Sequence, residues 1–151
     1  MTLGAGAPRR PTASPSPAGA APPNVHLRGR AYVELPVETN HWILVHGKEA
    51  VWTSLMRLVY RCEKRGSARK ISDMASLFEA DKLAPAVPGD DLGIDAADLE
   101  GFRRSYRWLT YVRMQAGGTV SQDLPGTDRP ADVARIYDAA EAWLDGKQLG
   151  M

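Results

Sequence analysis

The residues whose types could support metal or nucleophilic chemistry are few and far apart in the sequence. Three histidines, His26, His41 and His46, form no HxxxH pair, and none lies at a metal-ligand spacing from the single cysteine, Cys62. Cys62 falls on the apolar side of a predicted helix, a setting that favours buried packing over a reactive thiolate. The sequence therefore predicts no metal site.

Other catalytic motifs are missing as well. Gly4 and Gly6 have no GK[ST] behind them, so they do not form a phosphate-binding loop, and the chain has no GxSxG elbow. Four aspartates cluster without the spacing of a calcium loop, and helix capping accounts for two of them: Asp90, Asp91, Asp95 and Asp98. We therefore expect a protein without enzymatic activity and without a cofactor, although an enzyme of an unfamiliar type stays open.

Basic residues, by contrast, are concentrated in two stretches. The chain has 19 Lys and Arg against 18 Asp and Glu, a formal net charge of +1. Between Arg57 and Lys70 six basic residues accompany one acid, and every charge between Phe102 and Gln115 is positive. Arginine ridges on rigid helices attract a phosphate backbone. The predicted nucleic-acid contacts are Arg103, Arg104, Arg107, Arg57, Arg61, Lys64, Arg69 and Lys70.

The arginines of the second stretch have another interpretation. Arg103 and Arg104 can form ion pairs with Glu100, with Asp98 or with acids of the last predicted helix. In that case they belong to a solvated surface and offer no free guanidinium to a polyanion. The sequence leaves both interpretations open.

The elements that position these residues begin with extended chain. From Arg30 to Val37 apolar and polar residues alternate, which is typical of a strand with one buried face. The apolar face holds Ala31, Val33, Leu35 and Val37. Pro36 restricts this segment to an edge strand or its end. A second apolar run follows at Trp42–Val45, and we favour a short β-hairpin over an extended segment leading into the first helix.

Four helices are expected after this hairpin. Apolar residues recur at three- and four-residue steps, and the predicted helices span residues 48–65, 72–82, 95–117 and 129–145. Gly66 is a natural C-terminal stop for the first helix. Asp95 is the expected N-cap of the third, and Pro130 falls in the first turn of the fourth.

The resulting fold class is mainly α with a short β-hairpin, with about four helices in one compact domain over residues 25–146. Residues 1–24 hold six of the 11 prolines and few large apolar side chains, so we expect a disordered Pro/Ala-rich arm. Residues 147–151 form a tail. No run of about 18 apolar residues exists, and the N-terminus lacks a secretory signal. With its lone cysteine, the chain fits a cytoplasmic protein without membrane contact.

The order of the predicted elements resembles a winged helix-turn-helix domain. Residues 49–60 are similar to the first helix of that family and residues 71–78 to its second helix. The resemblance implies that the third helix is the recognition helix, with Arg103, Arg104 and Arg107 on it, and that residues 117–120 start the wing.

This resemblance implies binding of duplex DNA through the major groove, as a dimer. Tyr137 and Trp143 of the last predicted helix are then candidates for a dimer or partner interface. The alternative for that helix is simple core packing.

Two functions follow from these observations. The first is a small non-enzymatic DNA-binding protein of bacterial or phage origin, regulatory or replication-related; amino-acid usage suggests the source. The alternative is a protein–protein interaction or assembly protein, such as a scaffold or a phage structural accessory. The alternative rests on the Pro/Ala arm and on four tryptophans in a short chain, because exposed aromatic residues favour protein partners.

Overall fold

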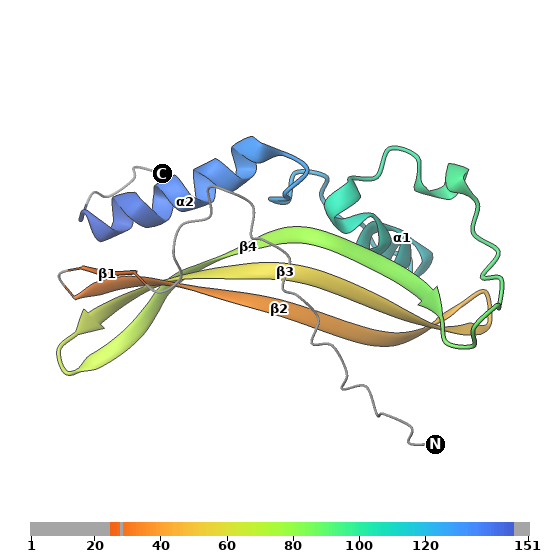
Figure 1. The fold of residues 1–151 in the computed structure, drawn as a ribbon, viewed down its shortest axis with the longest axis horizontal. Coiled ribbons are helices and arrows are strands. Elements are labelled where there is room, and N and C mark those ends of the chain that lie inside the picture. Colours follow the sequence, from red (N-terminus) through yellow and green to blue (C-terminus); the bar gives the residue numbers. More distant parts are fainter. Residues whose placement is uncertain (1–24, 28, 147–151) are drawn as a thin grey trace, which may run out of the picture.

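A computed structural model describes residues 25–27 and 29–146 of the 151-residue chain. The predicted arm (residues 1–24) and tail (residues 147–151) lie outside the described residues. The described chain forms one antiparallel sheet followed by two α-helices (Figure 1). The strands lie in the order β1 (Val25–Leu27), β2 (Arg30–Val45), β3 (Lys48–Arg65) and β4 (Ala68–Pro85).

The fold class predicted from the sequence is wrong, because the first two predicted helices are the long strands β3 and β4. Two-residue turns join β2 to β3 and β3 to β4, and His46 and Gly47 of the first turn have φ of 47° and 79°. Positive φ at both central residues is what the tightest hairpin turns require. Gly66, with φ of 62°, turns the next hairpin and does not end a helix. A left-handed glycine serves either purpose, so the sequence signal was ambiguous.

The predicted strand at residues 30–37 is confirmed, but it continues to Val45, so Trp42–Val45 is not a separate hairpin strand. Of the predicted buried face only Ala31 is buried, at 8% exposure. Tyr32 is 2% exposed, whereas Leu35 is 47% exposed. Pro36 lies where β2 pairs with β3 alone among the described strands, because β1 pairs only with residues 30–32.

Helix α2 (Pro130–Leu144) agrees with the helix predicted at residues 129–145. Pro130 occupies the first turn, where its missing N–H costs no helical hydrogen bond, and Gly146 follows the helix with φ of 78°. The helix packs on the Tyr32 face of the sheet. The core there contains Tyr32, Val59, Ala140 and Leu144, with Ile136 against it.

The helix predicted at residues 95–117 is largely wrong. Only α1 (Arg107–Gln115) is α-helical, preceded by two 3-10 turns, η1 (Ala96–Leu99) and η2 (Arg104–Tyr106). Gly101, with φ of 80°, lies between the two turns and interrupts the helical path. The predicted cap at Asp95 is present, since Asp95 and Asp98 form a capping box around η1.

A second core lies between α1 and the far half of the sheet. Its buried residues are Val45, Ala50 and Tyr111, with Ile43 and Leu83 packed against them. Strand alternation puts Ile43 and Val45 on the same face as Val33 and Leu35. The two helices therefore cover opposite faces at opposite ends of a twisted sheet, although both are drawn above it in Figure 1.

The resemblance to a winged helix-turn-helix domain is also wrong. The segments compared with its first two helices, residues 49–60 and 71–78, are parts of β3 and β4. The expected wing at residues 117–120 contains no strand. The described chain is mainly β-sheet, and its two α-helices are separated by a loop of 14 residues, 116–129, too long for a helix-turn-helix.

Candidate functional site

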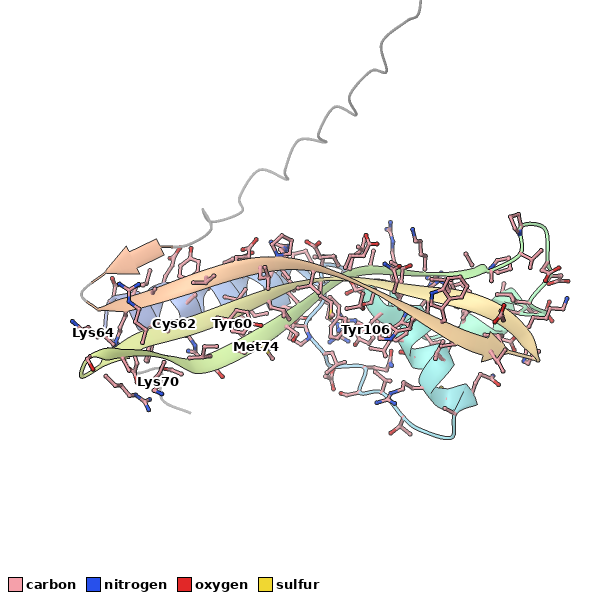
Figure 2. All side chains as sticks on the ribbon, turned by 90° about the horizontal axis from the view of Figure 1, so that it is seen from below. Tyr60, Cys62, Lys64, Lys70, Met74 and Tyr106 are labelled. Carbon is pink, nitrogen blue, oxygen red and sulfur yellow. The ribbon has the colours of Figure 1, made fainter. Side chains whose placement is uncertain are left out.

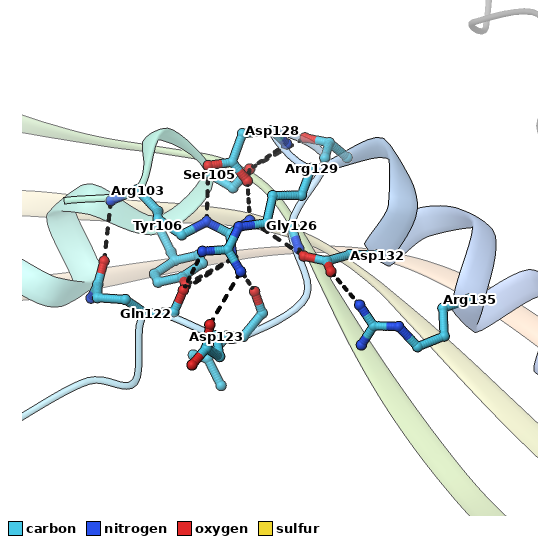
Figure 3. Close-up of polar contacts among 12 residues, drawn as sticks. Arg103, Ser105, Tyr106, Gln122, Asp123, Gly126, Asp128, Arg129, Asp132 and Arg135 are labelled. Atoms are coloured by element: carbon cyan, nitrogen blue, oxygen red, sulfur yellow. Dashed lines mark hydrogen bonds and ion pairs between the residues drawn. The ribbon is translucent and has the colours of Figure 1, made fainter. Parts of the chain in front are cut away.

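Arg103, expected on a free basic ridge, is buried at 9% exposure (Figure 3). Its guanidinium forms ion pairs with Asp128 and Asp132 and donates hydrogen bonds to the carbonyls of Leu124 (2.7 Å) and Gln122 (3.2 Å). These contacts join the start of α1 to the loop before α2. Arg103 therefore holds the fold together and offers no charge to a partner.

The carboxylates around Arg103 confirm this structural role. Burial alone would raise the pKa of the Asp128 carboxyl, but hydrogen bonds from Arg103 and Ser105 outweigh it and lower the pKa. Ser105 donates to Asp128 at 2.9 Å. Gly126 leaves room for this cluster, since a Cβ there would lie 2.6 Å from Asp128 Oδ1. The network is closely packed and internally satisfied.

Arg57 is engaged between the sheet and α2. The Nη1 of Arg57 donates to the Tyr137 hydroxyl at 2.5 Å, and that hydroxyl donates to Glu34 at 2.5 Å. The Nε of Arg57 lies 2.6 Å from Glu79. Burial, then the bond to Glu34, raises the pKa of Tyr137 well above its usual range. Tyr137 is 8% exposed, so this candidate interface residue packs inside the molecule.

Trp143 of α2 and Arg61 of β3 also lie where α2 packs on the sheet. The indole Nε1 donates to the carbonyl of Cys62 at 3.4 Å, and the Arg30 guanidinium lies 4.2 Å from the ring centre. Arg61 forms an ion pair with Asp73. Trp143 thus contacts the sheet, and the guanidinium of Arg61 has a carboxylate partner.

The remaining predicted contacts fall into two separate groups. Arg104 and Arg107 line a cleft beside β4, at the α1 half of the molecule. Lys64, Arg69 and Lys70 gather at the opposite end, around the turn between β3 and β4 (Figure 2). Within the described chain none of these five side chains forms an ion pair.

The sheet face opposite α2 is apolar and is left uncovered by the described residues over much of its length. Its rows pair Val33 with Tyr60 and Tyr60 with Met74 across the strands. Met74 is 50% exposed and Ile71 is 64% exposed. We call this surface the open sheet face, and it comprises Val33, Leu35, Val37, Met56, Leu58, Tyr60, Cys62, Ile71 and Met74. Large exposed apolar patches are common at binding sites, so this face is a candidate functional site.

The open sheet face leads into a basic end, formed by Lys64 and Arg69 on that face and by Lys70, which pairs with Glu63 across the strands and lies on the other face at the same turn. A hollow of about 590 Å³ lies there, and its lining joins these three residues to apolar neighbours such as Cys62 and Ile71. Lys64 and Arg69 are directly paired across the strands, and like charges in that position repel. Figure 2 shows Lys64 and Lys70 at the turn, with Cys62 and Tyr60 farther along β3.

The hollow is also lined by two charged side chains that already have partners within the chain. Glu63 forms an ion pair with Arg65, and Arg30 donates to the carbonyl of Trp143 at 2.9 Å. The basic end therefore has a surplus of positive charge beside an apolar surface. Sequence reasoning identified these three cations but missed the apolar surface. The helix predicted at residues 48–65 put Val59 in one apolar stripe with Leu58 and Cys62, whereas in β3 Val59 lies on the other face.

Comparison with known proteins gives two fungal relatives. The chain is 37% identical over 79 residues to the uncharacterized protein AN9274 of Emericella nidulans, a match covering 48% of this chain and 33% of that protein. It is 28% identical over 127 residues to a PEP2-like protein of Fusarium vanettenii, covering 80% of this chain and 54% of that protein. No protein-family model matches the chain.

The chain thus spans about half the length of the PEP2-like protein and a third of AN9274. Both relatives are fungal, and this overturns the bacterial or phage origin that amino-acid usage had suggested. The name of neither relative states an activity.

Two further observations concern the described residues. No three His, Cys, Asp or Glu side chains within residues 29–146 gather as a possible metal-binding set. Neither α1 nor α2 is long and apolar enough to cross a membrane. The absence of a cofactor, the absence of enzymatic activity and the cytoplasmic location stay predictions.

Proposed function

We propose that this chain is a non-enzymatic binding protein for an amphipathic anion, such as a long-chain carboxylate. The apolar part of the ligand lies along the open sheet face, and its acidic group lies at the basic end. The proposal rests on one observation: the apolar face, uncovered by the described residues, runs directly into two cations, Lys64 and Arg69, that form no ion pair within the described residues.

The dimensions of the surface suit such a ligand. Lys64, Cys62, Tyr60 and Leu58 follow one another on the same face of β3, since side chains alternate along a strand. Lys64 lies six positions after Leu58, which corresponds to about 20 Å of extended strand. An extended acyl chain can therefore lie along β3 with its carboxylate at Lys64 and Arg69.

Duplex DNA fits this surface less well. Three of the eight predicted contacts, Arg57, Arg61 and Arg103, are held by carboxylates. A phosphate backbone needs a basic surface, and it makes no use of a broad apolar face. The interaction with DNA stays a prediction that the experiment below includes.

A protein partner is the other occupant of the open sheet face. Trp42 and Leu44, each 71% exposed near the far end of β2, lie on the Tyr32 face, so an interface that included them would extend beyond the open sheet face. An apolar protein surface would leave the repulsion between Lys64 and Arg69 uncompensated, however. An acidic headgroup compensates it, and for this reason we favour the amphipathic anion.

The test compares ligands of equal chain length, each below its micelle concentration. Dodecanoate, dodecanol and dodecyltrimethylammonium are titrated into the full chain, with binding followed by calorimetry. We expect saturable binding of dodecanoate, weaker binding of dodecanol and the weakest binding of the cation. The double variant Lys64→Ala/Arg69→Ala should weaken dodecanoate binding about tenfold and leave dodecanol binding unchanged.

The matched control is Lys82→Ala/Arg113→Ala, which removes the same charge from exposed positions outside the hollow. It should bind dodecanoate as the wild type does. Equal binding of dodecanoate and dodecanol, or equal losses in the two double variants, would overturn the headgroup site. If none of the three amphiphiles binds and the chain self-associates with increasing concentration, the surface is a protein interface. If none binds and the chain binds a DNA duplex in a salt-sensitive way, the surface is a DNA-binding site.

A further inference from the structure

The long edge of the sheet formed by β2 leaves a row of backbone groups unpaired within the described chain. β3 lies on one side of β2, and on the other side β1 pairs only with residues 30–32 (Figure 1). From Val33 to Val45 no backbone hydrogen bond reaches β2 from a described element other than β3. An edge of this kind can accept a further strand.

The turn at the end of β2 shows which of its backbone groups point outward. Val45 and Lys48 flank the two-residue turn at His46 and Gly47, so they form a hydrogen-bonded pair of the β2–β3 ladder. Such pairs recur at every second residue, and the register of β2 with β3 has no shift. The odd-numbered residues of β2 therefore bond to β3, and the even-numbered residues direct their N–H and C=O groups away from it.

The position of Pro36 agrees with this assignment and limits the free edge. Pro36 is an even-numbered residue, so its missing N–H costs no bond of the β2–β3 ladder. Prolines, lysines and bulges commonly protect an exposed edge, and residues 39–45 contain none of them. The outward-pointing residues after Pro36 are Glu38, Asn40, Trp42 and Leu44.

Apolar groups lie on both sides of this stretch. On the Tyr32 face, Trp42 and Leu44 are each 71% exposed. On the opposite face, a hollow of about 330 Å³ lies between the end of β2 and α1, and its lining includes Ile43 and Val112. Side chains of a strand alternate between its two faces. A strand added beside β2 therefore meets apolar groups on both of its faces.

We propose that β2 binds an extended peptide segment of a protein partner as a further antiparallel strand along residues 38–44. The segment carries apolar side chains where it passes residues 42–44 and a basic side chain opposite Glu38, which forms no ion pair within the described residues. A peptide backbone offers the row of amides and carbonyls that this edge requires. This surface differs from the one proposed for amphipathic anions, and each proposal can fail without the other.

The probe is the acetylated and amidated peptide Val-Phe-Val-Thr-Thr-Thr-Lys, which has one residue for each position from Leu44 back to Glu38. Its binding to the full chain is followed by calorimetry. N-methylation of its third and fifth residues blocks amides that face β2, whereas N-methylation of its second and fourth residues blocks amides that face away. We expect the parent peptide and the second form to bind saturably and the first form to bind about tenfold more weakly.

The variants Trp42→Pro and Trp42→Ala separate the backbone of β2 from the indole ring. Both variants lack the indole, but only Trp42→Pro lacks the outward N–H, and pairing with β3 does not use this N–H. We expect Trp42→Pro to bind the peptide about tenfold more weakly than Trp42→Ala. Thermal unfolding checks that both variants keep the sheet, and the N-methylated peptides test the same ladder without altering the chain.

Amide hydrogen exchange locates the added strand. Saturating peptide should slow exchange of the amides of Glu38, Asn40, Trp42 and Leu44 and leave the amides at the basic end unchanged. The absence of saturable binding, or equal losses for the two N-methylated forms, would overturn the proposal. Protection of these four amides without peptide, increasing with protein concentration, would also overturn it and would show that a second copy of the chain occupies the edge.

Discussion

At the scale of single residues, the arginines of this chain divide by their surroundings. Arg103 and Arg57 lie between elements, where carboxylates from other segments surround them. A buried guanidinium needs such partners, because leaving its charge uncompensated costs several kcal/mol. Lys64 and Arg69 lie at the end of a hairpin, where no described acid compensates them. The first pair stabilises the fold, and the second pair is available for binding.

The Asp128 carboxylate gives a pH-dependent test of the structural pair. Its pKa is lowered in the folded chain, so its contribution to stability is complete above the ordinary aspartate pKa and disappears as the pH falls through the folded value. Asp128→Asn should therefore cost about 1–3 kcal/mol of unfolding free energy at neutral pH. The difference from the wild type should shrink at about pH 3.

Urea unfolding at both pH values measures this difference. Asp123→Asn is the control, because Asp123 is 88% exposed and pairs only with Arg129 at the surface. A penalty for Asp128→Asn that stays constant down to low pH would show that the carboxylate charge does not hold Arg103.

At the scale of elements, β3 is the central strand of the sheet and pairs with β2 and β4 along most of its length. Strand β2 pairs with β3 alone from Val33 onward among the described strands. In an antiparallel edge strand every second amide points away from its neighbour. A helix has no such alternation of its amides, so the pattern distinguishes the observed strands from the helices predicted from the sequence.

Amide hydrogen exchange followed by NMR can detect that difference. We expect continuous protection along β3 and alternating protection from Val33 to Val45 in β2, because alternate amides of an edge strand lack a partner. Continuous protection over the whole of β2, with no alternation, would show that the edge is covered and would contradict the exposed edge described here.

The sequence contained enough information for α2 and for the start of β2. Pro130 and Gly146 mark the ends of α2 by their backbone preferences, and these signals are local. The strands β3 and β4 were misread because Val51, Leu55 and Leu58 also fit a helical spacing, and local pattern cannot settle such cases. Hydrogen bonding of β3 to β2 and to β4, through two hairpin turns, decides that these segments are strands and not helices. Such pairing forms only in the assembled sheet.

The candidate site was predictable to a similar degree. Charge counts identified Lys64, Arg69 and Lys70 as available cations. Charge counts could not reveal the open sheet face. Successive side chains of a strand point to opposite faces, and the packing of other elements decides which of the two faces is buried. Leu35 and Val33 read as core residues in the sequence, and the packing of α2 on the Tyr32 face decides that they lie outside.

At the scale of the whole molecule, two helices are too few to cover both faces of a long twisted sheet. Helix α2 covers one face in the half of the sheet that carries the turn between β3 and β4, and α1 covers the other face in the far half. Figure 1 shows the two helices at opposite ends of the sheet. The uncovered apolar area costs free energy in water, about 25 cal/mol for each Å². Binding of an apolar ligand removes this cost, and the basic end selects ligands with an acidic headgroup.

The most direct test of this account uses the methionines as reporters of ligand position. Met56 and Met74 lie on the open sheet face, while Met114 is 52% exposed on α1. The methyl groups are labelled with ¹³C, and nitroxide-labelled stearate is added below its micelle concentration. The account predicts that the Met56 and Met74 signals broaden and that the Met114 signal does not. Equal broadening of all three signals, or none, would contradict it.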